Sequence, residues 1–294
     1  MTSASSSRRS RGSRNGRPFF SGDFIVKNVA LLFSIVSVWM VYSLWVRPTA
    51  EEVAIETRLR QAQDPDYTAP RSIAVILKDY EQQFAITLWL WATILLSLKL
   101  RRLAQEDALL KEKFLQLEPG ERILPDDALG HYKDLQAAIR ARKAWQGRIL
   151  PDVILAALHR FHSTRSIQDA ASCIRERSEV AGEELEADLS LIRYIIWAIP
   201  SVGFIGTVRG IGEALAQAQK ALAGDISGVT DALGLAFNST LTALLLSLVL
   251  MFMLHLLQGR QDKLILDIQN YCTDEVVGQM KIPAQETGTP AFQA

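Results

Sequence analysis

The chain is poor in cysteine, and its charge shows no excess of either sign. Cys173 and Cys272 are the two cysteines, and they lie too far apart in the sequence to indicate a disulfide framework or a thiolate metal site. The 32 Lys and Arg residues balance 32 Asp and Glu residues. A chain without net positive charge is not expected to bind nucleic acid.

Motifs for catalysis and for cofactor binding are also lacking. The segment GFIGTVRGIG (203–212) is rich in glycine, but it lies inside an apolar block with no strand before it, which excludes a dinucleotide fingerprint. His159 and His162 are three residues apart, but no carboxylate or cysteine nearby completes a metal site. We interpret both histidines as surface or packing residues. The sequence therefore predicts no enzyme, no cofactor and no metal centre.

Apolar residues are abundant and unevenly distributed. They make up 49% of the chain and concentrate in four blocks, at Phe24–Val46, Phe84–Leu100, Tyr194–Ala214 and about Leu233–Leu257. Blocks of this length are typical of membrane-spanning helices. The sequence predicts an all-α integral membrane protein with four transmembrane helices and a helical cytoplasmic insert. The third and fourth helices are expected to be long and to extend into the cytoplasm.

The basic clusters that flank the apolar blocks define the expected topology. They fall on one side of the membrane, apart from scattered residues in the first outer loop, which places both termini in the cytoplasm. The predicted parts are a disordered basic N-terminus (1–23), a first transmembrane hairpin with an extracytoplasmic loop (24–100), the insert (101–190), pore-forming transmembrane helices 3 and 4 (191–260), and a cytoplasmic helical tail with a disordered end (261–294).

The third block carries small residues on one helical face. Pro200, Gly203, Thr207 and Gly210 follow one another at steps of three and four residues. Gly206 and Gly210 repeat the small-xxx-small spacing that lets membrane helices approach closely. We expect Pro200, Gly203, Gly206 and Gly210 to serve packing or a kink. Packing within a bundle explains such a stripe as well as an ion path does.

Two charges stand at the end of the same block. The uninterrupted apolar part, Tyr194–Val208, is shorter than the roughly 20 residues that a spanning helix needs. Arg209 and Glu213 therefore lie in the bilayer or at its edge, where ionisable groups are costly unless they are paired. They are four residues apart, so we predict that they form a membrane charge pair.

The fourth block is polar for a membrane helix. Asp231, Asn238 and Thr242 share one face, and Thr240 and Ser247 lie on the opposite one. One face is suited to a polar path while the other packs. The alternative is that the hydroxyls bond to their own helix backbone and that Asp231 caps the helix.

Two segments together resemble a known family. IPSVGFIGTVRGIGEAL (199–215) and ALGLAFNSTLTALLLSLVL (232–250) are similar to the paired-helix signature of the MotA/TolQ/ExbB proton-channel family, and the resemblance covers about residues 165–275. It implies a homopentamer in the bacterial inner membrane, around a dimeric, single-span partner of the MotB/TolR/ExbD kind that carries the essential membrane aspartate. Proton passage would then power a motor or an energy-transducing complex. A hydroxyl-lined pore suits H⁺ or Na⁺.

The resemblance also assigns roles to individual residues. Thr207 matches the pore threonine of the first signature helix and Thr240 that of the second, while Pro200 and Gly206 match the family's proline and glycine. TolQ and ExbB have a glutamate where this chain has Leu235.

Two further positions depart from the family or leave a choice. Asp231, one turn before Leu235, is a candidate replacement for that glutamate, and Arg209 stands where an apolar or aromatic residue is usual. Helical phase alone places Thr242, not Thr240, beside Asn238 and Asp231; we follow the family match for Thr240. The predicted ion pathway thus includes Thr207, Thr240, Thr242, Asn238 and Asp231. The alternative function is a membrane scaffold that anchors partners through the insert and conducts no ion.

Overall fold

A computed structural model describes residues 22–64, 72–115, 117 and 120–283 of the chain. Within these ranges the regular secondary structure is helical. Ile123 and Met280 form an isolated β-bridge. The predicted all-α fold is therefore confirmed. The termini that we predicted to be disordered fall largely on residues 1–21 and 284–294, which lie outside the described residues.

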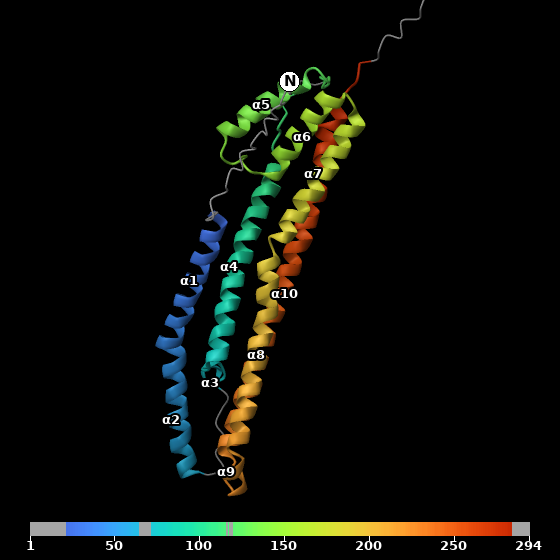
Figure 1. Ribbon diagram of the computed structural model, residues 1–294. Helices are drawn as coiled ribbons and strands as arrows, with labels where there is room; N and C mark the ends of the chain where they lie inside the picture. The colour runs from blue at the N-terminus through green and yellow to red at the C-terminus, as the bar shows by residue number, and fades with distance from the viewer. Residues whose placement is uncertain (1–21, 65–71, 116, 118–119, 284–294) are drawn as a thin grey trace, which may run out of the picture.

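Four helical segments are long and apolar enough to cross a membrane. They are Gly22–Thr57, Tyr80–Leu109, Ile167–Ala216 and Ser227–Gln279. Each contains one of the four apolar blocks, so the predicted set of four candidate transmembrane helices is confirmed. The helix that holds most of each apolar block lies beside the others along the length of the molecule (Figure 1). These helices are α1 (Gly22–Val41), α4 (Tyr80–Leu109), α8 (Ser190–Ala216) and α10 (Ser227–Glu275).

The first helix continues beyond the end that the sequence predicts. A π-helical turn, η1 (Tyr42–Val46), joins α1 to α2 (Arg47–Gln63), where we expected an extracytoplasmic loop to begin. Pro48 cannot donate a backbone hydrogen bond, and the wider π turn before it accommodates that loss. The following segment is rich in Ala, Glu, Gln and Arg, which favour helix. A short helix, α3 (Ile73–Leu77), precedes α4.

The transmembrane helices form a bundle around α8 and α10. These two helices pack against each other along most of the length of α8; α4 covers both, and α1 packs on α4 (Figure 1). Ile195 and Ile199 of α8 and Leu250 of α10 are fully buried in this bundle. The remaining faces of the helices are exposed and apolar, as lipid or further protein requires; examples are Leu32, Phe204, Leu248 and Phe252.

The insert is a small helical layer at one end of the bundle. It consists of α5 (Ala128–Ala141), α6 (Ile149–Thr164) and α7 (Ile167–Ala187), and α7 packs against the far end of α10. Leu150, Ile154 and Phe161 of α6 supply its buried core. We expected the last insert helix to run unbroken into the third membrane helix. A turn at Asp188–Leu189 separates α7 from α8, and Asp188 there pairs with Lys99 of α4.

The outer connection between the two central helices is short and partly helical. It contains α9 (Ala218–Leu222) and a glycine, Gly224, whose φ of 98° suits a residue without a side chain. At its other end α10 extends well past its apolar block and finishes in a 3₁₀ turn, η2 (Val277–Gln279). Gln279 and Lys281 there exchange backbone hydrogen bonds with Ile123 of the insert.

Candidate functional site: the seam between α8 and α10

The three glycines of the small-residue stripe lie where α8 and α10 approach most closely. A Cβ atom added to each would lie within 2.8 Å of an atom of α10: 2.6 Å from Ala243 Cβ for Gly203, 2.5 Å from Ser239 Oγ for Gly206, and 2.7 Å from the Ala232 carbonyl oxygen for Gly210. Because real Cβ atoms do not pack this tightly, these positions need glycine. We call the facing residues Gly203, Gly206, Thr207 and Gly210 of α8, with Ala236, Ser239, Thr240 and Ala243 of α10, the α8–α10 seam.

Two threonines meet in the middle of this seam. The Oγ1 atoms of Thr207 and Thr240 are hydrogen-bonded to each other, and both side chains are half-buried. Thr207 is also 3.2 Å from the carbonyl oxygens of Gly203 and Ala236, and Thr240 is 3.1 Å from that of Gly203. Each hydroxyl has one proton for several acceptors. The pair can therefore exchange donor and acceptor roles and still offer a lone pair to a proton or a cation.

Serine side chains complete the bonding across the seam. Ser239, which is 2% exposed, donates to the Ala236 carbonyl at 2.9 Å and lies 3.3 Å from that of Gly203. Pro200 has no N–H, so the carbonyl of Ile196 one turn earlier loses its helical partner. The Ser247 hydroxyl donates to this carbonyl at 3.1 Å. A buried carbonyl without a donor is costly in lipid, and Ser247 removes that cost.

The other polar residues predicted on the fourth helix lie away from this contact. Asp231 is exposed near the start of α10, and Asn238 and Thr242 are half-buried. Within the described part of the chain, the side chains of Asn238 and Thr242 have no hydrogen-bond partner. The structure thus brings Thr207 to Thr240 and leaves Thr242 outside the seam. The roles of all five of these residues in ion passage remain predictions.

Arg209 is held by two carboxylates, of which the sequence indicated one. Arg209 Nη1 lies 3.5 Å from Glu213 Oε1, at the predicted spacing of four residues. Its closer partner is Glu81 of α4: Arg209 Nε lies 2.8 Å from Glu81 Oε1, and Nη2 donates a hydrogen bond to Oε2 at 2.9 Å. The Glu81 side chain is only 13% exposed. A Cβ at Gly206 would lie 3.2 Å from Glu81 Cγ, so this ion pair borders the seam.

Sequence reasoning missed Glu81 because its partner lies on another helix. The available signal was an acidic residue three positions before the second apolar block, together with an arginine in an apolar segment that needs a counter-ion. Its neighbour Asp79, just outside the candidate span, belongs to the same charged region. Burial raises the pKa of the Asp79 carboxyl, and the charges of Lys78 and Arg209 oppose that rise.

The fold and the seam define a class of protein: an all-helical protein with four helices that are long and apolar enough to span a membrane, two of which form a close-packed, hydroxyl-bearing pair. A comparison with protein families makes this more specific. The model of the MotA/TolQ/ExbB proton channel family matches residues 146–270. No curated protein and no solved structure matches the chain.

The matched region contains α6, α7, α8, α9 and nearly all of α10. It includes every residue of the α8–α10 seam and Arg209, whereas Glu81 lies before it. The resemblance that we drew for about residues 165–275 is confirmed by this match, which covers residues 146–270.

Proposed function

We propose that the chain is the channel or stator subunit of a proton-driven motor or energy-transducing complex in a bacterial inner membrane. The observation that carries this proposal is the hydrogen-bonded pair of Thr207 and Thr240 within the family region. Both termini and the insert would lie in the cytoplasm, because Lys99, Arg101 and Arg102 end the second apolar block on the insert side.

The ion-binding carboxylate would come from a partner. A proton path through a membrane needs a titratable group along its length, and the seam offers hydroxyl and carbonyl groups only. A dimeric, single-span protein with a membrane aspartate would supply this group, as in the family. Five-fold assembly of the chain would surround that dimer. The threonine pair would then donate a hydrogen bond to the aspartate when it is charged and accept one when it is protonated.

Thr207→Val combined with Thr240→Val tests this role. The substitution keeps the branched shape of each side chain and removes both hydroxyls. We expect ion flux, measured with a pH-sensitive dye in vesicles from cells that co-express the neighbouring genes, to be lost while the native mass of the complex is kept. Thr93→Val of α4 is the matched control, since its hydroxyl bonds only to the Trp89 carbonyl of its own helix.

The variants also separate the alternatives. Wild-type flux in the double variant would contradict the proposal and favour a scaffold whose hydroxyls are dispensable. Loss of flux in Thr242→Val with normal flux in Thr240→Val would move the path to the face of Asn238 and Asp231. Replacing H⁺ by Na⁺ in the same assay identifies the ion.

A further inference from the structure

Arg102 occupies an unusual place at the insert end of α4. It lies two residues after the end of the second apolar block, and it forms no ion pair or hydrogen bond with any described residue. It lines three cavities, the smallest of which holds only about 10 Å³ and is also lined by Glu106 and Asp188. The other two are a cleft of about 170 Å³ between α1, α4 and the start of α8, and a pocket of about 290 Å³ between α4, α6 and α7.

The cleft has apolar walls and a rim whose other charges are paired. Its walls are formed by Val26, Leu95, Leu98, Leu191 and Ile192. At the rim, Lys27 pairs with Asp23 at 2.6 Å and Lys99 pairs with Asp188. Arg102 is therefore the one rim cation, among the described residues, that is left for another anion.

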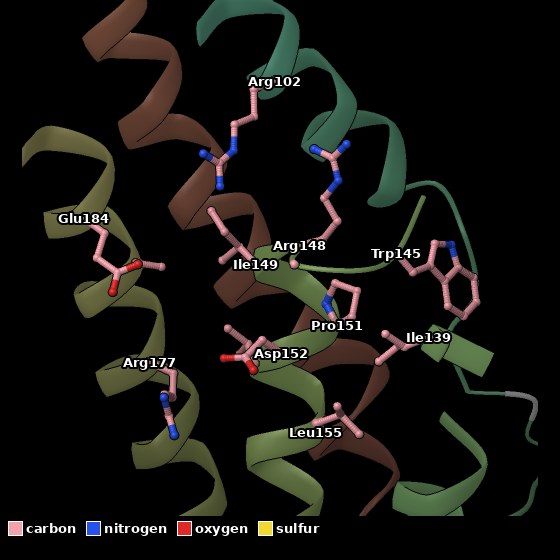
Figure 2. A pocket seen from close by; sticks show the side chains of 13 residues that line it. Arg102, Ile139, Trp145, Arg148, Ile149, Pro151, Asp152, Leu155, Arg177 and Glu184 are labelled. Atoms are coloured by element: carbon pink, nitrogen blue, oxygen red, sulfur yellow. The ribbon is translucent and has the colours of Figure 1, made fainter. Parts of the chain in front are cut away.

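The pocket on the other side of Arg102 is polar. Figure 2 shows the Arg102 side chain extending from α4 toward Ile149, and Arg148 lines the same pocket. Arg148 already lies 3.4 Å from Glu106 and donates to Gln105. From α6 and α7 the pocket also receives Asp152, Arg177 and Glu184, so it offers both positively and negatively charged side chains.

We propose that this place binds a phospholipid with an anionic head group, from the leaflet that faces the insert. One acyl chain fills the apolar cleft, the phosphate accepts hydrogen bonds from Arg102, and the head group enters the polar pocket. An apolar cleft at this depth of the bilayer is open to lipid, and a guanidinium matches a phosphate with two parallel hydrogen bonds. With the proposed topology, this is the inner leaflet. The proposal does not rest on ion conduction.

Neighbouring residues provide a matched pair of variants. Arg101 is also exposed at the end of the block, but it lines neither cavity. R101Q and R102Q therefore remove the same charge one residue apart. We expect R102Q to weaken the binding of phosphatidylglycerol by about tenfold, the equivalent of about 1.4 kcal/mol, and R101Q to leave it near the wild-type value.

The measurement is native mass spectrometry of the full chain, delipidated in neutral detergent and titrated with phosphatidylglycerol, phosphatidylcholine or inorganic phosphate. The wild type should retain phosphatidylglycerol and bind phosphatidylcholine more weakly. Leu98→Trp, which fills the cleft while keeping Arg102, should also lower retention. Equal losses in R101Q and R102Q would indicate general surface attraction and overturn the site. Displacement of the lipid by millimolar phosphate would show a free-anion site instead.

Discussion

At the scale of single residues, Arg209 shows how a charge inside a candidate membrane helix is paired. Its side chain is 39% exposed, and its guanidinium is divided between Glu81 at 2.8 Å and Glu213 at 3.5 Å. The i, i+4 spacing was enough to indicate Glu213. Glu81 contributes the shorter and more buried contact, so α4 is tied to α8 next to Thr207. This ion pair therefore connects α4 to the helix that carries Thr207 of the proposed ion path.

Glu81→Gln should destabilise the protein more than Glu213→Gln does. The first change leaves the Arg209 guanidinium with Glu213 at 3.5 Å as its one remaining ion-pair partner among the described residues. We expect a loss of no more than about 1 kcal/mol, since the exposure of Arg209 lets solvent screen the pair. Glu213→Gln should cost a few tenths of a kcal/mol. Thermal unfolding in detergent measures both. Adding Arg209→Gln to Glu81→Gln should recover part of the loss; an additive double variant would contradict the pairing.

At the scale of elements, the helix pair α8 and α10 depends on the absence of side chains at three positions. Gly210 is the most restricted of them, because a Cβ there would meet backbone atoms of Ala232 and Ala236 at 2.7 and 2.9 Å. Backbone cannot move aside as a flexible side chain can. Gly212 lies two residues further along α8, and a Cβ added to it would have no atom within 4 Å.

Gly210→Ala should therefore separate the two helices, whereas Gly212→Ala should not. We expect Gly210→Ala to destabilise the protein by about 1–3 kcal/mol, as overpacking does. Gly212→Ala should be neutral or stabilising by up to about 1 kcal/mol, because alanine favours helix. Thermal midpoints of the two variants in the same detergent decide this. Equal midpoints would mean that the close approach at Gly210 does not limit stability.

The same elements show how far sequence patterns reach. The spacing of Gly203, Gly206 and Gly210 predicted a close helix contact, and the structure has it. Helical phase put Thr240 and Thr242 on different faces of one helix, but it did not say which face meets Thr207. That choice depends on the rotation of α10 about its own axis. Packing of Ala236, Ser239 and Ala243 against the glycines sets that rotation, and a single helix does not encode it.

At the scale of the whole molecule, the described chain leaves large apolar surfaces uncovered. Phe204 and Ile205 of α8 and Leu244, Leu248 and Phe252 of α10 are all more than half exposed. In a single copy, these exposed faces of α8 and α10 would contact lipid. The proposed ring would cover part of these faces with neighbouring copies and leave the inner part for the partner's helices.

The native mass of the detergent-purified complex tests this arrangement. Co-expression with the neighbouring genes should yield a pentamer of the chain with a dimer of a single-span protein that carries a membrane aspartate. Mass photometry and peptide identification give the stoichiometry and the partner. A monomer or dimer that recruits no such protein would leave the seam as a packing device and support the scaffold alternative.

The sequence by itself determined the elements of this protein. The four apolar blocks predicted the four candidate spans, and the signature around Thr207 and Thr240 predicted the family, because hydropathy and local motifs are properties of consecutive residues. The helix over Arg47–Gln63 escaped prediction, because the apolar block ends at Val46 and the segment after it is largely polar and charged.

Only the tertiary structure decided which residues meet. Glu81 with Arg209, Ser247 with the carbonyl that Pro200 leaves free, and Arg102 between two cavities are contacts between residues far apart in the chain. Each depends on the relative rotation and depth of neighbouring helices. Those quantities follow from how side chains interlock across the whole bundle, and no single stretch of sequence contains them.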